Sequence, residues 1–324
     1  MPPTSPSVLV IRLDAIGDAL ALVPLLDAFR ERAIAADVLL RPNNAGVFSE
    51  RAAREIVVAG DVRQRSSDPE NLAAIERLGK SLQKRAYTHV LVATEDSAGY
   101  RLARATQAPQ RVGFTNLLGK PLKTLWSRNY VNVRVYRSAG LDRRAPHESE
   151  VLFRLGAPLL GRAIAPRRDP RYLRALVLEN EPLPDGRIAV QITDKWERLG
   201  IPFASVIESI ERLARLGKLR LLASNDEGAY ASSVEEAAKL NVERFAALEP
   251  WKAAIAAARA IVTPDSGALH VAGFVGTPTV AVFPPGPGFG LQVARWAPWA
   301  APHRIVRADS GWPTRAAGAL AQLL

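Results

Sequence analysis

The segment from Ile261 to Gly276 reads I-V-T-P-D-S-G-A-L-H-V-A-G-F-V-G, the pattern of a buried strand that leads directly into a helix. Asp265 and Ser266 are residue types that cap helices, and Gly267 lets the backbone approach a ligand closely. The first amide groups of a helix have no partner within it, so a phosphate could bind them. An ordinary capped helix in a core would have the same pattern.

The segment from Val8 to Arg32 has an apolar strand, a turn that holds Gly17 and a helix predicted from residue 18 to 33. In open α/β sheets, ligands bind beyond the carboxyl ends of the strands, so Asp14 and Asp18 would flank a ligand. Asp18 could equally cap its own helix and complement the helix dipole. Taken alone, this segment is compatible with both roles.

Taken together, the two segments resemble glycosyltransferase family 9, the ADP-heptose:lipopolysaccharide heptosyltransferases and their relatives. The resemblance runs through nearly the whole chain in the expected order. Its main motifs are R-L-D-A-I-G-D at residues 12–18, D-S-G-A-L-H at residues 265–270 and G-T-P-T-V-A-V-F at residues 276–283. Weaker echoes are H-E-S-E at residues 147–150, Q-I-T-D-K-W at residues 191–196 and R-W-A-P-W at residues 295–299.

Alternation of short apolar runs with amphipathic stretches independently predicts parallel sheets with crossover helices. The predicted strands lie near residues 8–13, 36–40, 55–59, 87–93 and 110–114, and then near 187–193, 218–224, 241–246, 260–263 and 278–283. Helices are predicted near residues 18–33, 69–85 and 96–107, and then near 202–216, 227–239, 249–259 and 265–275.

The fold class expected is therefore α/β, with two Rossmann-like domains. The resemblance implies that they face each other across a cleft, as in GT-B glycosyltransferases. We expect residues 1–160 to bind the acceptor and residues 175–312 to bind the nucleotide sugar. The last helix, residues 313–324, is expected to pack back on the first domain.

The resemblance implies an inverting transfer of a heptose-like sugar, with Asp18 as the general base. An ordinary carboxylate could serve, because the acceptor hydroxyl becomes acidic only as the new bond forms. Asp14 is a second candidate, or it orients the loop that contains Gly17.

The leaving diphosphate is expected at Asp265, Ser266 and Gly267, where amide groups and the helix dipole oppose its charge. Asp265 itself would cap the helix or contact a sugar hydroxyl. His270, one turn further, could donate a hydrogen bond to phosphate or be a half-buried histidine bonded to a carbonyl.

Lys195 follows a strand and Thr193, so it could reach the diphosphate as a mobile cation or be a solvated surface lysine. The family usually has one residue between this lysine and a tryptophan, whereas Lys195 and Trp196 are adjacent here. Arg198 is therefore an alternative phosphate ligand. Glu227, after another strand, is expected to bind ribose hydroxyls.

Composition narrows the class of protein. The chain has 324 residues, of which 48% are hydrophobic, and no cysteine, which excludes disulfides and thiolate chemistry. Without a long apolar run it is expected in the cytoplasm, with possible peripheral contact at the membrane. No D-x-D triplet occurs, so we expect neither a metal site nor a cofactor.

Positive charge is concentrated in one part of the chain. Residues 101–174 contain 16 Lys and Arg against 4 Asp and Glu, whereas the whole chain has a net charge of +11. This favours an anionic partner such as a glycolipid or glycan acceptor, or an acidic membrane surface. The arginines could also serve solubility alone. No nucleic-acid-binding module is recognisable, so nucleic acid is not expected.

Two other classes remain open. A nucleotide-cofactor oxidoreductase shares the alternation of strands and helices, but no G-x-G-x-x-G follows the first strand. A non-catalytic glycolipid- or nucleotide-binding protein could use the same scaffold. Substitution of Asp18 would then have no measurable effect.

Overall fold

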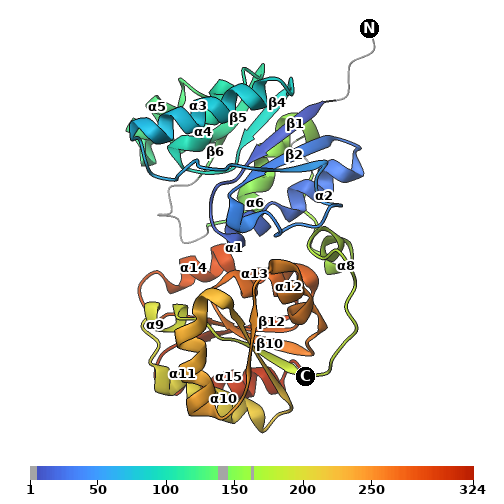
Figure 1. Cartoon of the computed structure of the whole chain (residues 1–324), viewed down its shortest axis with the longest axis vertical. Coiled ribbons are helices and arrows are strands. Elements are labelled where there is room, and N and C mark those ends of the chain that lie inside the picture. Colours follow the sequence, from blue (N-terminus) through green and yellow to red (C-terminus); the bar gives the residue numbers. More distant parts are fainter. Residues whose placement is uncertain (1–5, 138–144, 162–163) are drawn as a thin grey trace. The chain divides into compact units, whose positions relative to one another are not determined.

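The computed structural model describes residues 6–137, 145–161 and 164–324. It divides into two compact units, Met1–Arg167 and Arg168–Leu324 (Figure 1). Each unit contains one six-stranded sheet in which all strands are parallel. The predicted fold class, α/β with two Rossmann-like domains, is thereby confirmed.

The sheet of the first unit has the order β3-β2-β1-β4-β5-β6. Because the chain first moves to one side of β1 and then to the other, β1 and β4 border a crevice at their carboxyl ends. The edge strand β6 was not predicted, since it is short, contains Arg134 and is only half-buried on one face. The strands are β1 (Ser7–Ile11), β2 (Ala35–Leu40), β3 (Glu55–Val58), β4 (His89–Val92), β5 (Gln110–Thr115) and β6 (Val133–Tyr136).

The sheet of the second unit has the order β12-β11-β10-β7-β8-β9. Here β7 and β10 are neighbours at the corresponding reversal, so their carboxyl ends border the second crevice. The unpredicted strand is again at an edge, β12. The strands are β7 (Ile188–Gln191), β8 (Leu219–Ser224), β9 (Val242–Phe245), β10 (Ala260–Pro264), β11 (Thr279–Phe283) and β12 (His303–Arg307).

Helices cover both faces of the first sheet. Helices α3, α4 and α5 lie on one face, and α2 and α6 pack together on the other (Figure 1). The side change follows from right-handed crossovers, which switch faces when the strand order reverses. The helices of this unit are α1 (Ile16–Leu20), α2 (Val23–Glu31), α3 (Pro69–Gln83), α4 (Ser97–Ala105), α5 (Pro121–Ser127), α6 (Glu148–Phe153) and α7 (Ala157–Leu160).

The single helix predicted over residues 18–33 is wrong, because α1 ends at Leu20 and α2 begins at Val23. Pro24 lies in the first turn of α2. A proline lacks an amide hydrogen and its ring would clash with the carbonyl four residues earlier, so one helix cannot continue through it without a break. This leaves α1 as a short, separate turn beyond β1.

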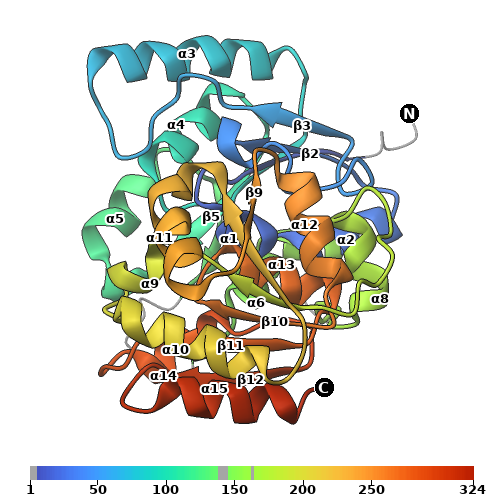
Figure 2. The ribbon, with the colours of Figure 1, turned by 60° about the horizontal axis from the view of Figure 1, so that its bottom comes forward.

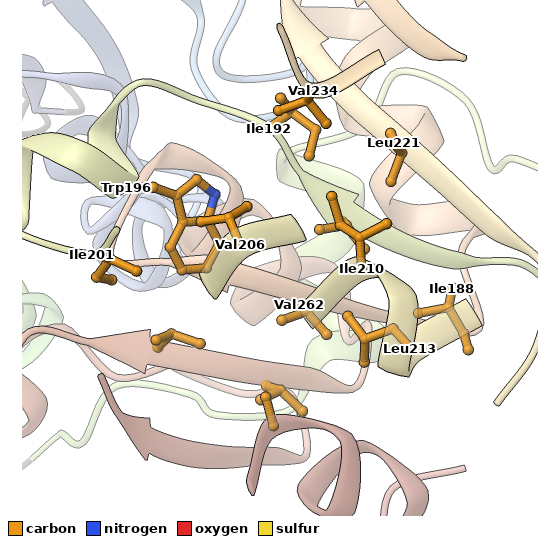
Figure 3. Packing of buried hydrophobic residues seen from close by; sticks show 14 of the residues in the cluster. Ile188, Ile192, Trp196, Ile201, Val206, Ile210, Leu213, Leu221, Val234 and Val262 are labelled. Carbon is orange, nitrogen blue, oxygen red and sulfur yellow. The ribbon is translucent and has the colours of Figure 1, made fainter. Parts of the chain in front are cut away.

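In the second unit, α10 and α15 pack side by side (Figure 2), while α12 packs against α13. The core beneath α10 is formed by Trp196, Val206, Ile210 and Val262 among others (Figure 3). The helices are α8 (Pro170–Leu173), α9 (Lys195–Arg198), α10 (Phe203–Ala214), α11 (Gly228–Ala238), α12 (Leu248–Ala257), α13 (Gly267–Val275), α14 (Phe289–Trp296) and α15 (Trp312–Ala321).

The last helix, α15, differs from the expectation that it returns to the first domain. Trp312, Ala316 and Leu320 are buried in the core of the second unit, and Trp312 stacks on Trp196 with ring centroids 5.5 Å apart. The apolar side of this helix is thus covered within its own unit, which corrects the expected placement.

Candidate active site

The crevice of the first unit is organised by Arg12, the residue that follows β1. Its guanidinium is only 3% exposed and lies among three carboxylates. The atom Nη2 is 2.9 Å from Oδ1 of Asp18 and 3.7 Å from Oε1 of Glu148, and Nε is 3.3 Å from Oδ2 of Asp14. Arg12 also donates to the backbone carbonyls of Asp18 and Ala93. One buried cation therefore fixes both predicted carboxylates.

Asp18 is held in place but is still reachable from solvent. It is the third residue of α1, where its Oδ2 accepts a hydrogen bond of 3.3 Å from the amide of Ala15. Its side chain is 29% exposed. Burial raises the pKa of Asp18; Arg12 opposes this, and the charges of Asp14 and Glu148 add to it. A fixed, accessible carboxylate with a raised pKa has the properties of a general base.

Gly17 is buried within α1, next to Asp18. Because α1 begins at Ile16, Asp18 does not open the helix as the sequence suggested, although it still accepts the hydrogen bond at the helix start. Asp14 precedes α1 and accepts a hydrogen bond of 3.3 Å from Gln64. The structure thus brings Asp14, Gly17 and Asp18 together at the end of β1.

Further charged residues continue from this cluster along the ends of the strands. Buried Glu148 accepts a hydrogen bond of 3.0 Å from Arg137, whose Nε is 3.3 Å from Glu95. Lys120 and Lys123 bind Glu95 at 2.8 and 2.9 Å. Burial favours the neutral form of Glu95, yet the two lysines outweigh it and lower its pKa to about 2.

These residues were not singled out from the sequence, since their pairing joins segments up to 136 positions apart. Two weak signals existed. Arg12 stands in the motif R-L-D-A-I-G-D, and Glu148 stands in H-E-S-E. What the motifs could not reveal is that Arg12 and Glu148 meet.

The crevice of the second unit begins with the loop after β7. Glu227 accepts a hydrogen bond of 2.6 Å from the hydroxyl of Thr193 and one of 2.8 Å from the amide of Asp194. The hydroxyl of Thr193 in turn accepts from the amide of Lys195 at 3.2 Å. Glu227 therefore anchors the loop that carries Lys195, a role that the sequence did not predict.

On the other side of this crevice, α13 begins at Gly267 directly after β10. Ser266 is the N-cap residue, but no side chain caps the helix, because the hydroxyl of Ser266 pairs with that of Thr263 at 3.0 Å. The predicted capping by Asp265 and Ser266 is thus wrong. The amide of Leu269 donates to the carbonyl of Ser266 at 3.2 Å, whereas the amides of Gly267 and Ala268 are available to an anion.

Three ionisable residues, Lys195, Asp265 and His270, influence one another electrostatically near the start of α13. Burial raises the pKa of Asp265, and the charge of Lys195 opposes that shift. Burial lowers the pKa of His270 to about 3, with a further contribution from Lys195, so His270 is neutral at pH 7. The ring of His270 meets Trp296 edge to face, with centroids 5.5 Å apart. Lys195 therefore acts electrostatically on both residues.

Arg198, the alternative phosphate ligand, has a different environment. Its side chain is 66% exposed and binds Asp194, the N-cap residue of α9, at 2.5 Å. The charge of Lys195 acts on Asp265 and His270, whereas Arg198 is engaged with a carboxylate at the surface. The geometry favours Lys195 of the two.

Among the described residues, no group of three or more His, Asp or Glu side chains is arranged to hold a metal ion. Within the same residues, no helix is both long and apolar enough to cross a bilayer.

Comparison with known proteins places this geometry in a family. Residues 210–319 match the model of glycosyltransferase family 9 (heptosyltransferase). This part of the chain is similar to family 9 glycosyltransferases. The resemblance inferred from the motifs and the expected class of enzyme, a glycosyltransferase, are both confirmed.

Several solved structures share the fold of this chain. E. coli heptosyltransferase WaaC with ADP superposes with a TM-score of 0.77 at 19% identity, covering 98% of this chain and 100% of that chain. E. coli ADP-heptose lps heptosyltransferase II gives 0.68 at 18% identity, covering 98% of each chain. A family 9 glycosyl transferase from Veillonella parvula DSM 2008 gives 0.71 at 16% identity, covering 95% of this chain and 87% of that chain. Comparison with curated proteins gave no match.

Proposed function

We propose that this protein is an inverting, metal-independent glycosyltransferase that moves a heptose-like sugar from ADP-heptose to a lipopolysaccharide core or a related glycan. The observation that carries the proposal is the uncapped start of α13, where open amides, Lys195 and neutral His270 converge. A diphosphate is the ligand that such a site suits, because it satisfies the amides and pairs with the lysine.

The donor is proposed to be an ADP-sugar. Two similar structures contain WaaC with ADP and WaaC with ADP-2-deoxy-2-fluoro heptose, at 19% and 20% identity to this chain. In this chain, we assign the diphosphate to Ser266, Gly267, Lys195 and His270. Glu227 is assigned to the ribose, because each of its oxygens can accept a second hydrogen bond besides those from Thr193 and Asp194.

Asp18 is proposed as the general base that removes the proton of the acceptor hydroxyl. Among the described residues, its oxygen Oδ2 accepts one hydrogen bond, of 3.3 Å from the amide of Ala15, which leaves capacity to accept a bond from the acceptor hydroxyl. A single displacement with this base inverts the anomeric carbon. Hydrogen bonds from backbone amides and the positive charge of Lys195 would stabilise the negative charge of the leaving diphosphate.

The acceptor is proposed to bind the first unit through its anionic groups. A polar cavity of about 840 Å³ lies beyond β2 and β3 and is lined by Arg41, Arg63, Arg65 and Arg77 among others. It adjoins the catalytic carboxylates, since Gln64, which also lines it, bonds Asp14. Phosphate or carboxylate groups of a glycan would pair with these arginines.

A panel of nucleotide sugars tests the proposal by thermal shift, because a ligand that binds only the folded state raises its stability. We expect ADP-heptose and ADP to raise the melting temperature, and UDP- and GDP-sugars to have little effect. ADP should then be released only when donor and acceptor are both present. Binding without release in the presence of any anionic glycan would favour the non-catalytic alternative.

A further inference from the structure

One stretch of the first unit lacks acidic residues altogether. From Ser97 to Leu141 the sequence contains no Asp or Glu and eight Lys or Arg. Lys120, Lys123 and Arg137 are engaged with Glu95. Within the described part of the chain, Arg128 and Arg134 pair with no carboxylate. This stretch therefore presents unneutralised positive charge to solvent.

Helix α5 lies in the middle of this stretch and has two different faces. Thr124 and Ser127 are buried, and Lys123 turns toward Glu95. Leu122 and Leu125, one turn apart, are 83% and 62% exposed. Trp126 packs against the core of the first unit, yet the solvent side of the helix carries two large apolar side chains, unlike a helix that only covers a core.

Leu117 extends this apolar surface. It is 54% exposed, and its carbonyl accepts a hydrogen bond of 3.3 Å from Thr124, which ties the preceding turn to α5. Eight large hydrophobic side chains are markedly exposed in the described residues, and three of them fall within these nine positions. A concentration of exposed leucines marks an interaction site rather than scattered surface residues.

We propose that the α5 surface, made of Leu117, Leu122 and Leu125 with Lys120 and Arg128 at its border, docks on an anionic lipid bilayer. The occupant follows from charge complementarity and shape. Leucines on a short helix with basic neighbours insert at the boundary of headgroups and acyl chains, and each basic residue gains from anionic lipids. Three leucines are few for the apolar centre of a stable protein interface.

This docking rests on the proposed function and extends it, since a glycolipid acceptor resides in a membrane. A chain of ion pairs connects the surface to the acceptor crevice: Lys120 and Lys123 pair with Glu95, which pairs with Arg137, and Arg137 pairs with Glu148. The surface would keep the acceptor crevice near the lipid headgroups. It contributes no group to catalysis, so the leucines can be exchanged without touching Asp18 or the donor residues.

Sedimentation of the full chain with sucrose-loaded vesicles tests the proposal. We expect binding to vesicles of phosphatidylethanolamine with phosphatidylglycerol, little binding to phosphatidylcholine vesicles, and weakening by salt. The double variant Leu122→Glu/Leu125→Glu should bind at least about tenfold more weakly, because two insertions are lost and negative charge is added. A matched control is Leu183→Glu in the second unit, where Leu183 is 87% exposed; it should bind as the wild type does.

The proposal is overturned if the wild type ignores anionic vesicles, or if the double variant and Leu183→Glu bind them equally well. ADP-induced thermal stabilisation of the double variant should equal that of the wild type, which shows that it is folded. Vesicle binding does not depend on sugar transfer. If only the transferase assignment were wrong, the protein would still bind anionic vesicles but would release no ADP.

Discussion

The two crevices lie at equivalent places in similar folds, yet they handle charge in opposite ways. In the first unit, Arg12 is buried among Asp14, Asp18 and Glu148, so that charges are paired before any ligand arrives. In the second unit, the amides at the start of α13 have no cap, His270 is neutral and Lys195 is the nearby cation. These environments suit the roles we propose, a general base in the first crevice and an anion site in the second.

This difference indicates a division of labour. A general base must be held in position and remain accessible to its substrate. A network of ion pairs can hold it, although burying those charges has a desolvation cost. A site for a leaving diphosphate gains from donors that have no other partner, since binding then satisfies them. Exchanges in the two crevices should therefore affect different kinetic constants.

The largest effect is expected for Asp18→Asn. The amide cannot accept the proton, so kcat should fall by about 10²- to 10⁴-fold. Donor affinity should be unchanged, as judged by ADP thermal shift. Asp14→Asn is the matched control and should lose much less activity, because Asp14 is a second ligand of Arg12. Equal losses in both variants would contradict the separate roles.

Lys195→Met should weaken ADP binding by about tenfold to a hundredfold, the range of a hydrogen bond to a charged group. Isothermal titration measures this directly. Arg198→Met, which removes a cation already bound to Asp194, should change the affinity by less than about threefold. A larger loss of affinity in Arg198→Met than in Lys195→Met would contradict the assignment of the diphosphate to Lys195.

Glu148→Gln should shift the pH dependence of kcat. As the proposed general base, Asp18 would act as its carboxylate, so the rate should fall as pH drops through the pKa of Asp18, which the charge of Glu148 helps to raise. Removing that charge lowers the pKa of Asp18, so the acid limb of the profile should move to lower pH. Glu70→Gln, an 84% exposed glutamate of the same unit, serves as control and should leave the profile unchanged.

The smallest effect is expected for Ser266→Ala. Because Ser266 caps no amide, the free energy of unfolding should fall by less than about 0.5 kcal/mol. Asp68→Ala should cost about 1 kcal/mol or more, since Asp68 caps α3 by accepting from Asn71 at 2.9 Å. Equal losses in urea unfolding would mean that Ser266 does cap its helix.

Much of this arrangement could be predicted from local patterns. The strand before Asp14 and the strand before Asp265 are long apolar runs, and carboxyl ends of parallel strands meet at one edge. The two edge strands β6 and β12 were missed because they alternate with arginines and are only partly buried. The break at Pro24 was visible in the sequence but was outweighed by the amphipathic pattern around it.

The network around Arg12 could not be predicted, since it depends on tertiary contacts of the segment after β1 with Ala93 after β4 and with Glu148 in α6. Likewise, Asp265 and Ser266 have the composition of a cap, and only the hydroxyl pairing with Thr263 shows that they leave the amides open. Residue types predicted which positions matter. The hydrogen-bond and ion-pair partners that determine the roles of these residues depend on the tertiary structure.

Backbone hydrogen exchange with and without ADP tests the division between the crevices most directly. We predict that ADP slows exchange of the amides at residues 266–268 and leaves those at residues 12–18 unchanged. Protection at residues 12–18 without protection at residues 266–268 would contradict the account.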